Sequence, residues 1–402
     1  MDVFRRRLKF VYGWYTLGFA LFVLGLALAE RLGLPNKWIG YVFMIATIAL
    51  YASIGVMSRT ADVAEYYVAG RRVPGFFNGM ATAADWMSAA SFIGLAGSLY
   101  LGGYQGLAFV LGWTGGYVLV ALLLAPYLRR FGQFTIPDYL GARYGGNLAR
   151  CMGSIGAVLA SFIYVVAQIY GVGLITSRFV GLEFEIGVFV GLAGVLVCSF
   201  LGGMRAVTWT QVAQYIILLV AYLVPVVILS YKVAGVPIPQ AMYGSVLEKL
   251  GAKEQALFDS PKEIEVREHF ARRAEELGRK IDALPQSLID ERKRLILRLE
   301  EIKQRAQSSA TAVSGAARAL RELPATPEAA REVWSATKAE LEAKSRRPLP
   351  HAAAYPGSDT EDSATMRINF ITLVIVLMIG TASLPHILMR YYTTPSVQEA
   401  RE

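Results

Sequence analysis

Cysteine and histidine are scarce in this chain of 402 residues, which contains two cysteines and three histidines. Cys151 and Cys198 both fall in apolar segments, so we expect buried thiols rather than a disulfide. The histidines at 269, 351 and 386 are widely separated, and no acidic or thiol cluster has the spacing of a metal site. Nucleophile–base pairs and nucleotide-binding fingerprints are also missing from the sequence. We therefore predict that the protein is not an enzyme, has no cofactor and has no transition-metal centre.

Acidic residues are scarce outside one segment of the chain. Residues 241–362 hold 21 basic and 21 acidic side chains, whereas the rest holds 19 basic and only 10 acidic ones. The net charge of +9 therefore comes from short loops between apolar runs. This distribution is typical of a membrane topology signal and not of a polyanion-binding patch, so we expect no nucleic-acid partner.

Long apolar runs fill most of the remaining sequence. Hydrophobic residues make up 54% of the chain and the mean hydropathy is +0.42, which is unusual for a soluble protein. Eight runs approach the ~20 residues that a helix needs to cross a bilayer, and they lie at 11–29, 38–57, 76–104, 107–127, 151–177, 186–201, 207–231 and 368–384. The first run follows a basic start, as in a signal peptide, but residues 30–32 form a poor cleavage site. The predicted fold is an all-α polytopic membrane protein with about eight transmembrane helices and a helical extramembrane insert.

The basic residues of the short loops predict the orientation. If the N-terminus is cytoplasmic and the runs alternate, inside loops carry 14 basic residues and outside segments carry 5. Because positive residues favour the cytoplasmic side, we expect a multi-pass membrane protein with this orientation. The insert then lies outside the cytoplasm.

The chain divides into four predicted segments. Residues 1–37 form an extra transmembrane helix, 38–236 a first transmembrane repeat, 237–366 a polar insert, and 367–402 the start of a second repeat with a cytoplasmic tail. Apolar residues recur every three or four positions between 264 and 304, which indicates amphipathic helices on either side of Pro285. A helical hairpin or short coiled coil is the simpler interpretation. The alternative is an arm that contacts a periplasmic partner or a second copy.

The run at 76–104 is the least regular of the eight. Asp85, Ser88 and Ser91 lie in its middle and glycines crowd its end. A carboxylate at mid-membrane costs about 2.5–3.5 kcal/mol on insertion scales, so Asp85 is expected to face protein, water or an ion. Small and polar residues let a helix open and expose carbonyls to a cation. We predict an interrupted helix that helps to form an ion or substrate site, although a polar cluster joining two helices would explain the same residues.

Gln168 is a neutral hydrogen-bonding residue inside the fifth run. At membrane depth it can contact a substrate or form a hydrogen bond between helices. The sequence alone does not separate these two roles.

Five stretches together resemble the sodium:solute symporter family, in particular its acetate-permease-like, long-form bacterial branch. They read EYYVAGR at 65–71, FNGMA at 77–81, AADWMSAASFIGLAG at 83–97, GGMRAVTWTQVAQ at 202–214 and GTASLPHILMRYYT at 380–393. Their order along the chain matches that family, and the resemblance covers residues 41–401 outside the insert. The insert itself is not general in the family.

The resemblance implies a partial inverted-repeat, leucine-transporter-like fold, in which core helices one and six are broken. It places the sodium ligands on the main-chain oxygens of Ala84 and Met87, with further ligands on core helix eight. The chain stops at Glu402, just after core helix six. We therefore expect a fragment of a longer transporter, separately encoded helices, or a defective product. Gln211 stands where the family often has an acidic residue.

The function implied is a cation-coupled symporter that imports a small organic anion with Na⁺, most simply a short monocarboxylate such as acetate. Besides the sodium ligands, the candidate residues for substrate binding or ion coupling are Asp85, Ser88, Ser91, Gln168 and Thr381. Asp85 suits ion coupling or structure better than anion binding, because its charge would repel the substrate. Two alternatives remain, a symporter-like sensor domain of a signalling protein and an inactive fragment of a transporter.

Overall fold

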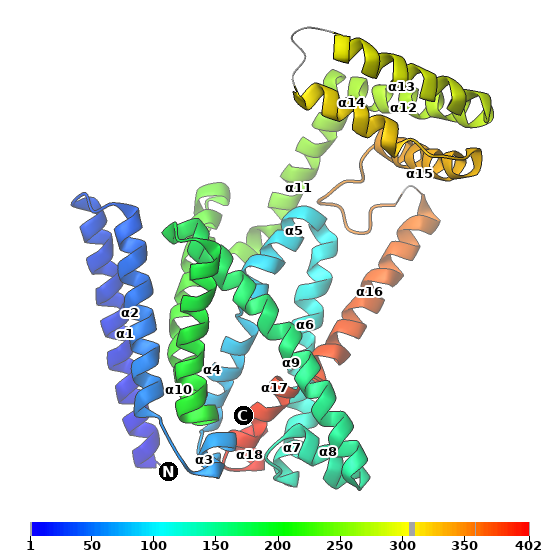
Figure 1. Ribbon diagram of the computed structural model, residues 1–402. Helices are drawn as coiled ribbons and strands as arrows, with labels where there is room; N and C mark the ends of the chain where they lie inside the picture. Colours follow the sequence, from blue (N-terminus) through cyan, green and yellow to red (C-terminus); the bar gives the residue numbers. More distant parts are fainter. Residues whose placement is uncertain (1, 305–309, 358, 402) are drawn as a thin grey trace. The chain divides into compact units, whose positions relative to one another are not determined.

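The computed structural model describes residues 2–304, 310–357 and 359–401, and every regular element in this part of the chain is helical (Figure 1). The all-α class predicted from the sequence is therefore confirmed for the described residues. The chain forms two compact units. The first, here called the membrane unit, comprises Met1–Gly244 and Asp359–Glu402, and the second, the insert unit, comprises Ser245–Ser358.

The membrane unit contains the apolar helices. Its α-helices are α1 (Asp2–Arg31), α2 (Asn36–Met57), α3 (Val63–Val68), α4 (Gly75–Trp86), α5 (Ala96–Gly102), α6 (Leu107–Leu119), α7 (Ala125–Phe131), α8 (Ile136–Tyr144), α9 (Asn147–Ile175), α10 (Phe184–Ala234), α16 (Thr360–Ala382), α17 (Pro385–Met389) and α18 (Val397–Arg401). Short 3₁₀ and π-helical turns connect several of them, including η2 (Ala90–Leu95) after α4 and η6 (Arg390–Thr393) after α17.

Within the described residues, six helical stretches are long and apolar enough to cross a membrane: Val3–Arg31, Asn36–Met57, Ala90–Phe131, Asn147–Arg178, Ser199–Ala234 and Thr360–Ala382. This differs from the eight predicted runs for two local reasons. The run at 76–104 is divided between α4, η2 and α5, and the run at 186–201 yields only a shorter apolar helix, Phe184–Val197. A multi-pass membrane protein follows from either description.

A sharp bend at Gly203 separates the two parts of α10. Gly203 has φ +49° and ψ −139°, and a Cβ at this position would lie 2.5 Å from the carbonyl oxygen of Tyr66. Only glycine combines this backbone conformation with so close an approach. Beside the bend, Glu65 on α3 forms an ion pair with Arg205 at 2.5 Å and accepts a hydrogen bond from Thr60 at 2.7 Å. These contacts fasten α3 to the start of the second half of α10.

Glycines also set the packing of α6 against α16. A Cβ on Gly112 would lie 2.5 Å from Cβ of Leu377, and one on Gly116 would lie 2.5 Å from Cβ of Thr381. Small residues at such positions let two helix backbones approach closely. The close approach holds α16 and the break after it in a fixed register against α6.

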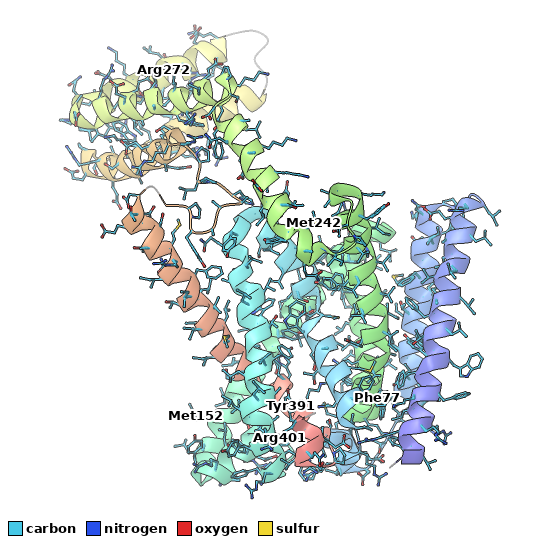
Figure 2. All side chains as sticks on the ribbon, turned by 180° about the vertical axis from the view of Figure 1, so that it is seen from behind. Phe77, Met152, Met242, Arg272, Tyr391 and Arg401 are labelled. Carbon is cyan, nitrogen blue, oxygen red and sulfur yellow. The ribbon has the colours of Figure 1, made fainter. Side chains whose placement is uncertain are left out.

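Aromatic side chains attach the first helix. Tyr12 of α1 packs against Phe77 and Trp209, with ring centroids 5.6 and 6.4 Å apart, and its hydroxyl donates to the Trp209 carbonyl at 3.1 Å. Figure 2 labels Phe77 on α4, close to the start of α1. The N-terminal part of α1 therefore packs on the start of α4 and on Trp209 of α10.

The insert unit consists of α11 (Pro239–Phe258), which enters it from the membrane unit, and α12 (Pro261–Asp282), α13 (Gln286–Gln304), α14 (Ala310–Glu322) and α15 (Pro327–Ser345). The break at Pro285 lies where the sequence predicted it. The main partner of α12 is α15 rather than α13, so the predicted hairpin of two helices describes only part of the insert unit. The small core of the insert unit contains Ile281, Leu288, Ala330 and Trp334. Charged side chains dominate its surface, as around Arg272 in Figure 2.

Replacing Gly116 with alanine should destabilise the membrane unit. The added methyl group overlaps Thr381, and overpacking of this kind typically costs ~1–3 kcal/mol. Thermal unfolding of the solubilised protein should show a clear drop in Tm. Gly156→Ala on α9 is the matched control, because no atom lies within 4 Å of a Cβ built there. Equal Tm values for the two variants would contradict the packing described for α6 and α16.

The Glu65 contact predicts a pH-dependent contribution to stability. The hydrogen bond from Thr60 and the neighbouring Arg205 guanidinium lower the pKa of the Glu65 carboxyl. A carboxyl whose pKa is lower in the folded state stabilises the protein at pH values above its unfolded-state pKa of about 4.3. This contribution is lost as the pH falls through the folded-state pKa.

Glu65→Gln should therefore lower Tm at pH 7 by an amount that corresponds to at most about 1 kcal/mol, because the pair is partly exposed. The gap between wild type and variant should close below about pH 4. A gap of constant size from pH 7 to pH 3 would show that the carboxylate charge is not responsible. Thr60→Val should reproduce part of the loss at pH 7.

Candidate functional site

Helix α4 ends at Trp86, inside the stretch where the sequence predicted an interruption. In a continuous helix the Ser88 and Ala89 amides would bond to the carbonyls of Ala84 and Asp85. Instead, Ser88 donates to the Trp86 carbonyl at 2.9 Å and Ala89 donates to Oε1 of Gln168 at 3.1 Å. The carbonyls of Ala84 and Asp85 therefore lose the donors that regular helix geometry would give them.

A second break faces the first. Helix α16 ends at Ala382, and Leu384 is extended before Pro385 starts α17. Pro385 cannot continue the preceding hydrogen-bond ladder, so the chain changes direction here. The short helix α17 and the turn η6 then bring Arg390 to the end of α4.

Asp85 and Arg390 form a buried, bidentate ion pair. Nε of Arg390 donates to Oδ2 of Asp85 at 2.7 Å and Nη2 donates to Oδ1 at 3.0 Å, with only 4% and 10% of the two side chains exposed. Nη1 of Arg390 donates to the Thr208 hydroxyl at 3.1 Å, and Nε2 of Gln211 also donates to Oδ1 of Asp85. Two broken helices and α10 thus meet at a single carboxylate.

A cavity of about 750 Å³, here called the central cavity, opens beside this pair. Five of the sequence-predicted site residues line it: Ala84, Asp85, Met87, Ser88 and Gln168. The Nε2 atom of Gln168 and the Oε1 atom of Gln211 are buried and have no hydrogen-bond partner among the described residues. These two groups offer one donor and one acceptor to a molecule in the cavity.

Ser91 and Thr381, the other two predicted site residues, do not line the central cavity. Ser91 is 1% exposed and its hydroxyl donates to the Ser88 carbonyl at 2.9 Å. Thr381 is buried against Gly116 of α6. Both residues support the two breaks rather than face the cavity.

Several cavity residues escaped the sequence reasoning. Arg390 lies in the stretch at 380–393 that carried the family resemblance, but its role depends on a partner 305 positions away. His386 stacks on Tyr164 of α9, with ring centroids 4.8 Å apart and an interplanar angle of 26°. His386 and Tyr164 both line the central cavity. A polar residue at a predicted break was the one available signal for Arg390 and His386.

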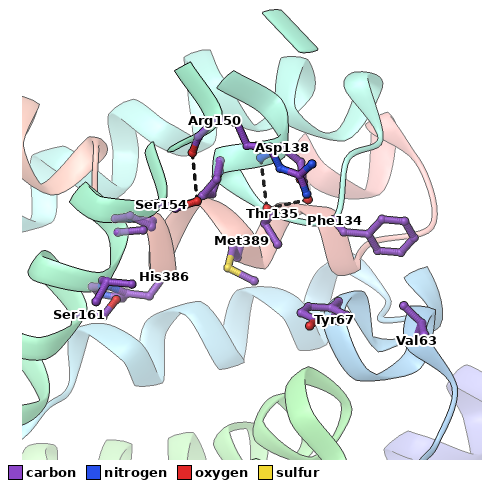
Figure 3. A pocket seen from close by; sticks show the side chains of 14 residues that line it. Val63, Tyr67, Phe134, Thr135, Asp138, Arg150, Ser154, Ser161, His386 and Met389 are labelled. Carbon is purple, nitrogen blue, oxygen red and sulfur yellow. Dashed lines mark hydrogen bonds and ion pairs between the residues drawn. The ribbon is translucent and has the colours of Figure 1, made fainter. Parts of the chain in front are cut away.

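A further cavity of about 570 Å³ lies between α3, α8, α9 and α17 (Figure 3). An ion pair between Asp138 and Arg150 at 2.8 Å forms part of its wall. Ser161, His386 and Met389 line both this cavity and the central cavity. These three side chains therefore stand between the two spaces.

The segment after η6 fastens the helices around the site. Arg129 donates to the carbonyls of Thr394 and Pro395 at 2.6 and 2.7 Å, and the Glu399 carboxylate accepts from the Gly75 amide at 2.6 Å. Glu399 also pairs with Arg5 of α1. Carboxylates are favourable at helix N-termini, so Glu399 stabilises the start of α4.

The oxygen atoms at this site suit a hard monovalent cation. Main-chain carbonyls, carboxylates and amide oxygens are the ligands that such cations prefer. Within the described residues, no group of three or more His, Cys, Asp or Glu side chains could hold a metal ion. Any cation here would therefore depend on carbonyl oxygens around the break together with Asp85.

Comparisons with known proteins agree with the sequence resemblance. The family model described as "Sodium:solute symporter family" matches residues 66–257, a range that includes the α4 break, α9 and α10. An uncharacterized symporter of Cupriavidus necator is 53% identical over 404 residues, which cover 99% of this chain and 59% of that protein. The resemblance to the sodium:solute symporter family is therefore confirmed by a match over residues 66–257.

The chain spans about 59% of the length of this relative. A solved structure described as "Substrate-bound outward-open state of a Na+-coupled sialic acid symporter reveals a novel Na+-site" is 16% identical, with 87% of this chain and 80% of that chain covered. Its TM-score of 0.45 is too low to transfer the arrangement of individual helices.

Removing the side-chain oxygen of Gln168, which accepts a hydrogen bond from Ala89, should destabilise the folded protein at the α4 break. Gln168→Leu leaves the Ala89 amide without its partner, and a buried unsatisfied amide costs about 1–3 kcal/mol. We expect a lower Tm for the solubilised variant. Gln214→Leu is the matched control, since Gln214 lines the same cavity but makes no hydrogen bond to the break among the described residues. If both variants had the wild-type Tm, the Gln168 bond would not stabilise the break.

Proposed function

We propose that this protein is a Na⁺-coupled secondary symporter that imports a small organic anion, most simply a short monocarboxylate such as acetate. The observation that carries the proposal is the break in α4, where carbonyls without their helical donors lie beside a cavity that also contains a buried arginine. The family match and the symporter relative support coupled transport. The choice of acetate rests on the sequence resemblance alone.

Sodium would bind at the main-chain oxygens of Ala84 and Met87. A regular helix offers no such ligands, because its carbonyls are already bonded to amides. The redirected Ser88 amide accounts for the free carbonyl of Ala84. In this proposal Na⁺ is the coupling ion, and it stabilises an outward-open state.

The substrate would occupy the central cavity beside Ser88 and Gln168. The buried Nε2 of Gln168, which has no partner among the described residues, can donate to a carboxylate oxygen. Rocking of one group of helices against the other would then expose the site to each side in turn. In this proposal Ser91 and Thr381 do not contact the substrate, and they affect binding by holding the two helix breaks in position.

The surplus of basic residues in alternate loops supports a cytoplasmic N-terminus in the inner membrane of a bacterium. In that orientation the insert unit lies on the periplasmic side. A periplasmic protein or a second copy of the chain would be its partner.

Uptake of labelled acetate into proteoliposomes tests the function. An inward Na⁺ gradient should raise the initial rate clearly above the rate in an equal K⁺ gradient, because only Na⁺ is proposed to bind together with the substrate. Unlabelled propionate should compete, whereas neutral acetamide should not, because it lacks the carboxylate charge. Equal rates in the two gradients would overturn sodium coupling, and equal competition by acetamide would overturn the anionic substrate.

A further inference from the structure

The central cavity contains one positive and one negative side chain. Among the described residues that line it, Arg390 is the only lysine or arginine and Asp85 the only aspartate or glutamate. The two side chains neutralise each other through a bidentate contact. The lysine, arginine, aspartate and glutamate side chains of the cavity wall therefore sum to zero charge.

This neutrality restricts which ligands can enter. An anion that binds alone adds an uncompensated negative charge, and a cation that binds alone adds a positive one. Unpaired charges are strongly disfavoured in a buried, membrane-embedded site. An anion and a monovalent cation that bind together leave the site neutral, because each can pair with one member of the Asp85–Arg390 contact.

We propose that Arg390 binds the substrate carboxylate and that Asp85 is transferred from Arg390 to the coupling cation, so that exchange of partners at this ion pair couples the two ligands. The inference rests on the proposed function, which it deepens by assigning the anion-binding residue and the origin of the coupling. Arginine suits this role, since its planar guanidinium matches a carboxylate in a two-point contact.

The neighbours of the pair fit such an exchange. Thr208 accepts a hydrogen bond from Nη1 of Arg390, so the guanidinium keeps one anchor when Asp85 leaves it. On the Asp85 side of the pair, Gln211 donates a hydrogen bond to Asp85 through Nε2, and its buried Oε1 has no partner among the described residues. Together with the freed Ala84 carbonyl, Asp85 and Gln211 supply three oxygen ligands of the kind a hard cation prefers.

Equilibrium binding to the full-length protein in detergent tests the exchange. Binding of labelled acetate is measured at increasing Na⁺, and binding of ²²Na⁺ is measured at increasing acetate. Reciprocity requires that each ligand strengthen the other by the same factor. For wild type we expect a factor on the order of tenfold or more, within the range usual for linked sites.

Single substitutions separate the two roles. Asp85→Asn leaves Arg390 free of its carboxylate, so acetate should bind without Na⁺ and Na⁺ should change its affinity less than about twofold, which is below the usual range for coupled ligands. Arg390→Gln should abolish acetate binding, while ²²Na⁺ still binds and no longer responds to acetate. Glu65→Gln is the matched control, because the Glu65–Arg205 pair does not line the central cavity. It should retain wild-type coupling.

The double variant Asp85→Asn/Arg390→Gln guards against misfolding of the single variants. It removes both charges and so leaves neither one buried alone. It should bind neither ligand in a coupled manner. The inference is overturned if this variant keeps coupled binding, if Asp85→Asn keeps the wild-type dependence on Na⁺, or if Arg390→Gln binds acetate normally.

Wild type distinguishes failure of this inference from failure of the proposed function. If wild type binds no acetate at any Na⁺ concentration, the proposed substrate is wrong. If lowering the pH without Na⁺ promotes acetate binding and Na⁺ adds nothing, the compensating cation is a proton and the assignment of sodium is overturned. Once wild type is seen to bind both acetate and Na⁺, the variants test the exchange of partners at the ion pair.

Discussion

The ion pair between Asp85 and Arg390 is the contact on which the membrane unit depends. It joins the end of α4 to the turn after α17, and these two segments are separated by most of the chain. A buried ion pair is not in itself a strong source of stability, because both charges lose their hydration. The pair instead makes one arrangement of the two segments strongly preferred, because loss of either partner would leave the other charge buried and unpaired. The pair therefore fixes how the two broken helices meet.

The segment that supplies Arg390 also holds the beginning of α4. Its Thr393 carbonyl accepts from the amide of Val73, its Thr393 hydroxyl donates to Asn78, and its Glu399 carboxylate accepts from the amide of Gly75. One short stretch of chain thus contacts both ends of the same helix. Movement of this stretch relative to α4 would have to change these contacts together, which fits the alternation between two states that we propose for this protein.

The central cavity combines neutrality with unused polar groups. Its charged residues cancel, while Gln168 and Gln211 each have one buried atom without a partner among the described residues. Such groups are costly to leave unsatisfied and are therefore uncommon in well-packed cores. Both side chains contact the break after α4, Gln168 through Ala89 and Gln211 through Asp85, and a ligand that completes their hydrogen bonds best explains the two unused atoms.

Patterns in the sequence were enough to predict the helical class, the position of the α4 interruption and the break at Pro285, because apolar periodicity, a mid-span carboxylate and glycine or proline act locally. The family was predicted from five stretches that resemble it. Together, the patterns and the resemblance identified five residues that line the central cavity. The folded chain was needed to show that Ser91 and Thr381 pack away from that cavity, that α12 pairs with α15, and that Asp85 is held by Arg390. These outcomes depend on contacts between residues far apart in the chain, and no local pattern encodes which distant side chain will neutralise a buried charge.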